Sequence, residues 1–327
     1  MRIVTPSVEI MRTGLGRDTL VKPEQFIERV GRTCYKSEDK ITDDSASKFV
    51  ANLIKRGHEA VIEHWSLIFK TDGGSYNDFK NDWNVLLSGA NIPLTERLRP
   101  HIRFTDYIKE DGEVRFVISA NMRAWRDYAK ACVEGFGLVP QYMWGIVRNY
   151  PLFFPEFQDY VPVITNHTIL IPINVCDLSE EERLVHQDVT MKFICDRGVS
   201  HEVVRHREAS YAQESTRYCN YSGDKFGGEL TFVRPSWCGE GTNVYEIWKD
   251  GCKRAEDDYF SLLAASGVPQ EARSLLPSST KTEVVVTANL SDWNHFFALR
   301  DHSAAHPDMH EIAAMAHCMY DKDVLKV

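Results

Sequence analysis

The stretch "RHREASYAQESTRY", from Arg205 to Tyr218, sets the expectation for the whole chain. Within fourteen positions it holds three arginines, two serines, two tyrosines and one histidine. Arginine keeps its charge and binds phosphate oxygens in pairs, hydroxyl groups donate to the same oxygens, and tyrosine rings offer a flat face. The stretch therefore predicts a ligand that carries both negative charge and a flat ring. The alternative interpretation is three surface arginines paired with Glu208 and Glu214.

Composition narrows the class of protein around this stretch. The chain has 327 residues, 43% of them hydrophobic, and a formal net charge of -9. An acidic balance argues against a polyanion-binding surface, so any anion site must be a local pocket. The eight cysteines form no CxxC pair, and we find no signal peptide and no apolar run near the ~20 residues of a membrane span. We therefore expect a cytoplasmic protein with reduced thiols and no nucleic-acid or membrane partner.

Helix and strand patterns follow one another without a regular βαβ alternation, which favours an α+β fold. We expect strands at His64–Thr71, Val114–Ser119 and Asp188–Cys195. We expect helices from Pro23, from about Ser47 to Arg56, from Ser179 with Glu182 completing a capping box, from Cys252 to Ser266, from Pro269 and after Pro307. Ser200 is the expected cap of a short helix ending near Arg205, and Ser291 that of a helix running to Arg300.

Other chemistry receives little support from the sequence. Neither the glycine pattern of a dinucleotide-binding turn nor that of a P-loop occurs in the sequence. His302, His306 and His310 are four residues apart, a spacing that can align metal ligands on a helix. Pro307 interrupts that helix, so we expect no metal site.

Four segments together resemble one family, the flavin-dependent thymidylate synthases. "RHREASYAQES", residues 205–215, matches the family's RHR-x7-S signature. "RGHEAVIEH" (56–64), "EARSLLP" (271–277) and "ANLSDWNHFFALR" (288–300) resemble three further family segments in the expected order. The resemblance covers about residues 23–71 and 188–320. It implies one domain over residues 1–327, with a mostly antiparallel central sheet flanked by helices, and with residues 72–187 as an insertion that we expect to be peripheral.

The resemblance implies an activity, its cofactor and its assembly. Family members convert dUMP to dTMP, taking the carbon from methylenetetrahydrofolate and the hydride from NADPH through FAD. They form homotetramers with active sites at subunit interfaces. By position, the residues implied on the flavin side are His58, Arg205, His206, Arg207, Gln213, Asn289 and His295. Those implied on the nucleotide side are Glu202, Arg205, Gln213, Ser215, Thr216, Arg217, Arg273 and Arg300.

Arg300 is the expected catalytic residue, because a fixed guanidinium would stabilise charge that develops on the uracil ring. Ser215 is assigned to substrate binding, since no base is arranged beside it. The chain departs from the family pattern at five positions, which are Ala60, Glu202, Gln213, His295 and Ala304.

Three rival interpretations are weighed against this one. A classical thymidylate synthase is not supported, because none of the eight cysteines follows a proline. A module for single-stranded nucleic acid would use arginines and aromatic rings, but the net charge of -9 opposes it. Another flavoenzyme that shares only the FAD pocket is the third. A yellow protein whose colour responds to dUMP would separate these possibilities.

Overall fold

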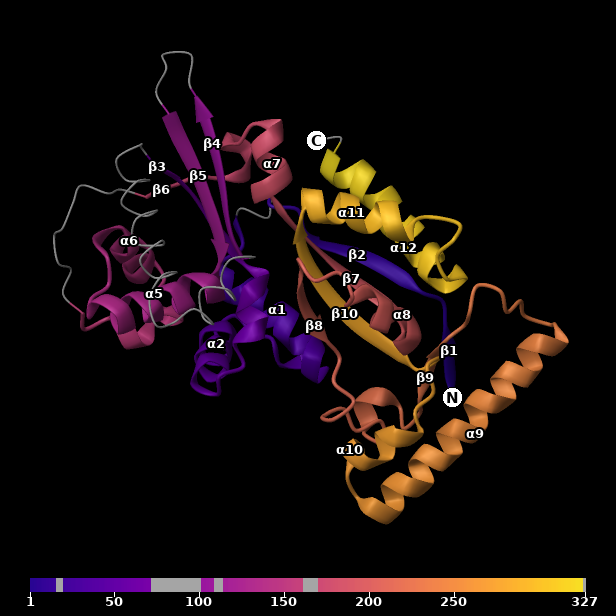
Figure 1. The fold of residues 1–327 in the computed structure, drawn as a ribbon. Helices are drawn as coiled ribbons and strands as arrows, with labels where there is room; N and C mark the ends of the chain where they lie inside the picture. The colour runs from indigo at the N-terminus through magenta and orange to yellow at the C-terminus, as the bar shows by residue number, and fades with distance from the viewer. Residues whose placement is uncertain (16–19, 72–100, 109–113, 161–169, 326–327) are drawn as a thin grey trace.

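The computed structural model describes residues 1–15, 20–71, 101–108, 114–160 and 170–325 (Figure 1). Its central sheet has the strand order β2 (Ser7–Arg12), β7 (Asp188–Asp196), β10 (Lys281–Asn289) and β8 (Ser210–Gln213), and all neighbours are antiparallel. Its longest pairing joins β7 and β10, in register from Lys281 opposite Asp196 to Asn289 opposite Asp188. The predicted α+β fold with a mostly antiparallel central sheet is confirmed.

Helices cover both faces of this sheet. β10 reads "KTEVVVTAN", a β-branched run that is buried along nearly its whole length. Val284 and Val286 join the core beneath α11 (Leu290–Arg300) and α12 (Pro307–Tyr320). Val285 points the other way, into the core that contains α1 (Pro23–Tyr35). A strand buried on both faces explains why apolar and polar residues do not alternate along β10.

Strands from the predicted 72–187 insertion form a second antiparallel sheet with β3, which belongs to the segment that resembles the family. The order is β4 (Ile102–Ile108), β5 (Val114–Asn121), β3 (Ser66–Thr71) and β6 (Ile171–Pro172). Because β6 pairs with β3, the chain returns close to the point where it left. α5 (Met122–Phe136) and α6 (Gln141–Asn149) then pack an aromatic core that includes Trp125, Tyr128 and Phe153.

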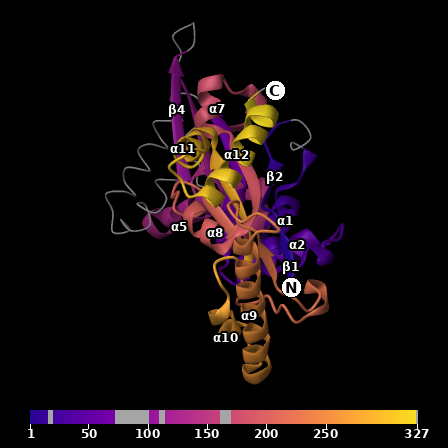
Figure 2. The same cartoon turned by 90° about the vertical axis from the view of Figure 1, so that its right-hand side faces the viewer.

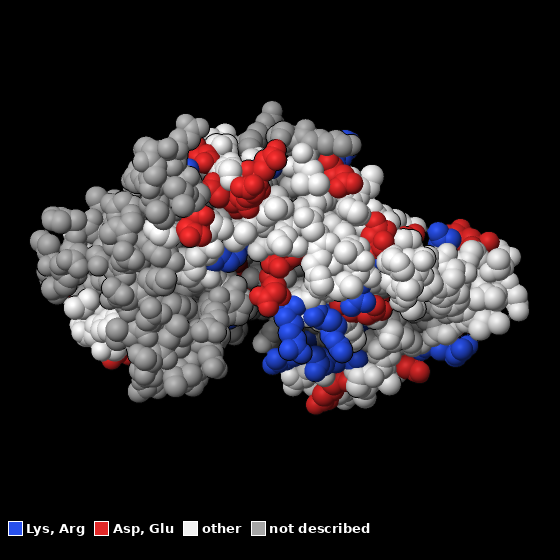
Figure 3. Space-filling model, turned by 45° about the horizontal axis from the view of Figure 1, so that its top comes forward, with Lys and Arg blue, Asp and Glu red and all other residues white. Residues whose placement is uncertain are grey.

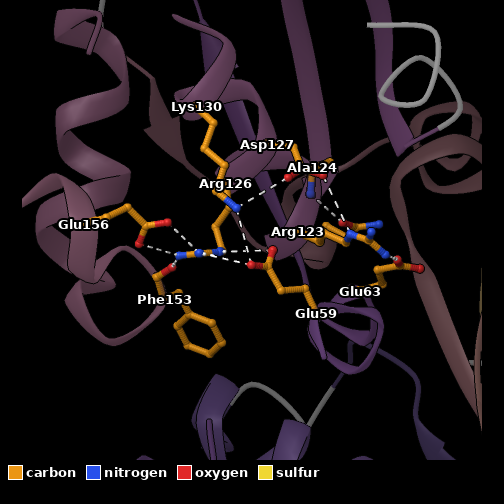
Figure 4. Close-up of polar contacts among 10 residues, drawn as sticks. Glu59, Glu63, Arg123, Ala124, Arg126, Asp127, Lys130, Phe153 and Glu156 are labelled. Atoms are coloured by element: carbon orange, nitrogen blue, oxygen red, sulfur yellow. Dashed lines mark hydrogen bonds and ion pairs between the residues drawn. The ribbon is translucent and has the colours of Figure 1, made fainter. Parts of the chain in front are cut away.

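One face of α5 carries three cations, spaced i, i+3 and i+7, that bind the short helix Glu59–His64 (Figure 4). Arg126 is only 1% exposed and lies between Glu59 and Glu156, at 3.3 and 2.6 Å from their carboxylate oxygens. Lys130 Nζ lies 3.3 Å from the same Glu59, and Arg123 binds Glu63 at 2.5 Å. Charge pairing therefore attaches the insertion to the "GHEAVIEH" segment.

The remaining elements surround the two sheets. They are α2 (Ser45–Lys55), α7 (Glu180–His186), α8 (Arg197–Val203), α9 (Asn243–Ser266), α10 (Pro269–Ala272), and the parallel strands β1 (Arg2–Val4) and β9 (Thr231–Val233). α9 extends away from the sheets (Figures 1 and 2). Along the described stretches, none of the helices has both the length and the apolar character needed to cross a bilayer.

Expected starts are confirmed for the helices at Pro23, at Ser179 with its capping box, and after Pro307. Three other starts were wrong. α8 is capped by Asp196 instead of Ser200, because the Asp196 carboxylate accepts the Val199 N–H at 2.8 Å. α11 is capped by Asn289, not Ser291, through the N–H of Asp292 at 2.7 Å. α9 begins at Asn243 after the Thr242 cap, well before Cys252.

Candidate functional site

The arginine-rich motif is divided by β8, which separates its two ends in space. Residues 205–209 precede the strand and residues 214–217 follow it. Four strand residues at ~3.3 Å each span roughly 13 Å. The two ends of the motif therefore serve different places on one chain.

A pocket of about 240 Å³ lies at the first end of the motif, between the loop before β8 and helix α11. Its floor is apolar and includes Val286, Trp293 and Phe296. Its rim contains the guanidinium groups of Arg205, Arg207 and Arg300 and the imidazole rings of His206 and His295. On the face drawn in Figure 3, lysine and arginine side chains gather in one compact group beside acidic ones. A flat ring on the floor and an anion at the rim would both fit this arrangement.

Arg205 and Arg207 are exposed, and within the described ranges neither forms an ion pair. The alternative that these arginines are paired with Glu208 and Glu214 is wrong. Glu214 binds Lys281 at 2.9 Å and accepts from the Tyr221 hydroxyl at 2.9 Å instead. Two guanidinium groups at the pocket rim are thus available for an anionic ligand.

Arg300 is half-buried and held in a fixed position. Its Nη1 lies 2.8 Å from the Glu202 carboxylate, and its Nε donates to Nε2 of His206 at 3.0 Å. Burial and the Arg300 charge, with a smaller effect of His295, lower the pKa of His206 to about 4. His206 is therefore neutral near pH 7 and accepts from Arg300, while the Tyr211 hydroxyl donates to its backbone carbonyl.

A second, smaller pocket of about 30 Å³ adjoins the first, and Asn289 lines it. The 72–187 insertion contributes His101, Arg103 and Asn121 to its wall. Both Nη atoms of Arg103 bind the Asp188 carboxylate, at 2.8 and 3.0 Å. Burial alone would raise the pKa of Asp188, but the Arg103 charge and the Ser66 hydroxyl lower it below its ordinary value. At this edge residues of the predicted insertion line the smaller pocket, and their expected position outside the flavin pocket stays a prediction.

The second end of the motif lies beside α1. The N–H of Ser215 donates to the Cys34 carbonyl at 3.0 Å, Thr216 is buried, and Arg217 is exposed with its guanidinium 5.4 Å from the Tyr218 ring. His58 belongs to this end as well, since its Nδ1 lies 3.2 Å from the Tyr35 hydroxyl. The Tyr35 and Tyr218 rings are 5.6 Å apart.

Two predicted site residues stand apart from both groups. Gln213 uses its amide on neighbouring hydroxyl groups, donating to Ser200 at 2.9 Å and to Thr282 at 3.2 Å. Arg273 is exposed in the short helix Arg273–Leu275, next to α10. One chain therefore brings together Glu202, Arg205, His206, Arg207, His295 and Arg300, with Asn289 nearby. It does not bring them to His58, Ser215, Thr216, Arg217 or Arg273.

Sequence reasoning overlooked two acidic residues at the site. Asp292 and Glu208 line both pockets, although both fall inside the quoted family segments. Burial raises the pKa of Asp292 to about 6; the Arg103 charge opposes this rise, and Glu208 and Asp188 add to it. The available signal was the sequence "RHRE", in which a carboxylate directly follows the two arginines.

The α+β fold and this rim of arginines define a candidate anion-binding site, and comparisons with known proteins specify the family. The family described as "Thymidylate synthase complementing protein" matches residues 18–77 and 175–322. The chain belongs to this family. The unmatched residues between these segments, 78–174, all fall within the predicted 72–187 insertion.

Named relatives are similar over part of the chain. The flavin-dependent thymidylate synthase of Pyrococcus furiosus is 36% identical over 119 residues, which are 36% of this chain and 48% of that protein. That of Thermococcus kodakarensis is 34% identical over 140 residues, 42% of this chain and 56% of that protein. The chain thus spans about half the length of the curated relatives it matches. The structure of PolB, a UMP/dUMP methylase from Streptomyces cacaoi bound with 5-Br dUMP, is 23% identical over 42% of this chain and 67% of that chain, with a TM-score of 0.35.

Proposed function

We propose that the chain is a flavin-dependent thymidylate synthase that converts dUMP to dTMP. In this proposal methylenetetrahydrofolate supplies the carbon, and NADPH supplies the reducing equivalents through FAD. The observation that carries the proposal is the pocket itself, where Arg205 and Arg207, which form no ion pair among the described residues, lie at the rim of an apolar floor. Membership of the family supports the same conclusion.

The residues of the pocket fit a flavin. When bound, the flavin supplies hydride chemistry that no amino-acid side chain can provide. The apolar floor suits one face of a flat ring, and Arg205, His206 and Arg207 suit phosphate or carbonyl oxygens. At about 240 Å³ the pocket is at the low end for ligand sites, so one chain would hold only part of a dinucleotide. Four further flavin contacts stay predictions. Asn289 and His295 lie at the two pockets, whereas His58 and Gln213 line neither of them.

The substrate side follows from charge and position. Arg300 would polarise the uracil ring, because its guanidinium is fixed at the pocket and cannot lose its charge. The nucleotide phosphate would use Arg217 and Arg273, together with Ser215 and Thr216. These groups occupy separate places on one chain, which supports a homotetramer that assembles each site from several copies. Light scattering tests this arrangement, and an active monomer would refute it.

Reconstitution and a single turnover test the proposed function. We expect the purified chain, incubated with excess FAD and then desalted, to retain a flavin absorbance spectrum. Supplied with dUMP, methylenetetrahydrofolate and NADPH, it should form dTMP, and flavin reoxidation should depend on dUMP. A chain that binds no FAD would refute the proposal. Flavin reduction without dTMP would favour a different flavoenzyme that shares only the FAD pocket.

A further inference from the structure

Two carboxylates connect the candidate pocket with the smaller pocket beside it. Asp292, on α11, and Glu208, in the loop before β8, are the titratable residues that line both cavities. Asp292 is half-buried and Glu208 is exposed. Across the described ranges, neither side chain has a hydrogen-bond or ion-pair partner. Carboxylates that border a ligand pocket and remain free of partners are able to take and release protons.

We propose that Asp292 is the general base of this site and that Glu208 adjusts the pH at which Asp292 acts. The inference rests on the proposed function, in which a methyl group replaces the hydrogen on C5 of the pyrimidine. The carbon and two hydrogens come from the folate, and the third hydrogen comes as hydride from the reduced flavin. The C5 hydrogen must therefore leave as a proton, with its bonding electrons remaining on the ring, and the Asp292 carboxylate accepts it.

The other titratable groups of the two pockets are less suited to this step. Asp188 is bound by Arg103 and Ser66, and Glu63 is bound by Arg123. His206 already accepts from Arg300. His295 lines only the larger pocket, so it lacks the route through the smaller cavity. That cavity, at about 30 Å³, has the volume of one water molecule and gives the proton a path away from the substrate.

The charges around Asp292 set its proton affinity. Burial is the largest contribution and, with Glu208 and Asp188, raises its pKa to about 6, while Arg103 and His295 lower it. Glu63 and His101 also line the smaller pocket, and Tyr211, whose pKa is raised by burial and by the Asp292 charge, lines the larger one. An acid that titrates near neutral pH combines a populated carboxylate with a useful proton affinity. Removing the Glu208 charge should lower the pKa of Asp292, so the rise of activity with pH should move to lower pH.

The test compares the FAD-loaded parent with three variants, using release of tritium from [5-³H]dUMP into water and formation of dTMP. Asp292→Asn should retain FAD and dUMP but lose roughly 10²–10⁴-fold in both rates. Asp292→Glu, which keeps the carboxylate one methylene further out, should recover part of the loss and shows that the position tolerates substitution. Asp258→Asn, an exposed carboxylate on α9, is the matched control and should leave both rates unchanged.

The pH profile tests the role of Glu208. In the parent, tritium release should rise with pH around a midpoint near 6, and in Glu208→Gln this midpoint should lie lower. An unchanged or higher midpoint would overturn the assignment of Glu208. If Asp292→Asn kept its FAD and released tritium within twofold of the parent, Asp292 would not be the base.

A spectroscopic measurement keeps this inference separate from the proposed function. Infrared difference spectra, parent minus Asp292→Asn, report the protonated carboxyl band of Asp292 whatever reaction the protein catalyses. If the parent formed no dTMP, the proposed function would fail. A carboxyl band of Asp292 that titrates near pH 6 in the parent, and at lower pH in Glu208→Gln, would still support its role as an acid–base group. Titration near pH 4, the ordinary value for aspartate, would overturn the inference even in an active enzyme.

Discussion

Replacing Arg300 separates a role in the reaction from a role in the fold. Arg300 ends α11, and a cation at a helix C-terminus stabilises the helix by under ~1 kcal/mol when exposed. Its guanidinium does more than this, because it binds Glu202 at 2.8 Å and His206 at 3.0 Å at the rim of the pocket. We expect Arg300→Ala to slow dUMP-dependent flavin reoxidation, measured with dUMP saturating, far more than it lowers the melting temperature.

The magnitude follows from the number of contacts that the guanidinium makes. A hydrogen bond to a charged group contributes about 1.5–3 kcal/mol, and each ~1.4 kcal/mol is a factor of ten in rate. One such contact to the polarised uracil therefore corresponds to about tenfold to more than a hundredfold, and a second raises the upper limit to about ten-thousandfold. Arg300→Lys keeps the charge but not the planar fork, so it should recover only part of the rate.

His206 provides an internal check on the same variant. The Arg300 charge is one of the causes that lower the pKa of His206 to about 4, after burial. Removing that charge should raise the pKa of His206 toward its ordinary value, which NMR titration of its ring protons would detect. A parent-like rate in Arg300→Ala, with a small loss of melting temperature and an unmoved His206 titration, would leave only the helix-capping role and refute the reasoning.

Three further expectations concern binding and stability. Arg273→Ala should weaken dUMP binding in calorimetry more than it slows the bound complex; a rate loss at saturation instead would contradict a phosphate role. Arg126→Met should lower the free energy of unfolding by about 1–3 kcal/mol in urea, because it removes the ion-pair partner of Glu156 and leaves the partly buried Glu59 with Lys130 alone, whereas the more exposed Lys130→Met should cost under ~1 kcal/mol. Burial would raise the pKa of Glu283, but its partners Lys281 and Lys36 lower it to about 2. The ion pairs of Glu283 therefore stabilise the fold fully above pH ~4.5, and this stabilisation is lost as pH falls toward 2. The difference in unfolding free energy between the parent and Glu283→Gln should therefore shrink between pH 5 and pH 2, and a constant difference would contradict this ion pairing.

The wrong helix boundaries have a common physical cause. Asp196 and Ser200 are both suitable caps four residues apart, and only the pairing of Asp196 with Lys281 at the end of β7 selects the first. Asn289 likewise ends β10 and caps α11 in the same position. At the start of α9 the apolar side chains are exposed, Ile247 by 63%, so the pattern of a buried face begins only later. Strand pairing and side-chain exposure depend on the tertiary structure, so the spacing of residues in the sequence does not predict where these helices begin.

The candidate site was predictable by residue type but not by arrangement. The sequence motifs correctly identified residues that lie together in the structure. The "RHR" loop before β8 and the end of helix α11, which carries Arg300, line the same pocket. The same motif also contains Ser215. Its spacing does not reveal that strand β8 lies between the "RHR" residues and Ser215. Distances along a strand grow by ~3.3 Å per residue, so a fourteen-residue signature can reach two separate sites. A motif that matches as one unit in sequence is therefore compatible with a site assembled from several copies.

The insertion was the least predictable part, because its role at the site depends on charges that meet only after folding. Arg103 comes from β4 and Asp188 from the start of β7, yet they form a two-pronged ion pair at the wall of the smaller pocket. Arg126 makes an equally buried contact with Glu59, next to His58. Loss of Arg103 would leave the buried Asp188 charge without its cationic partner, whereas Glu59 would keep Lys130. The predicted insertion is thus bound to the family's own segments by ion pairs at two places, Arg103 with Asp188 and Arg126 with Glu59.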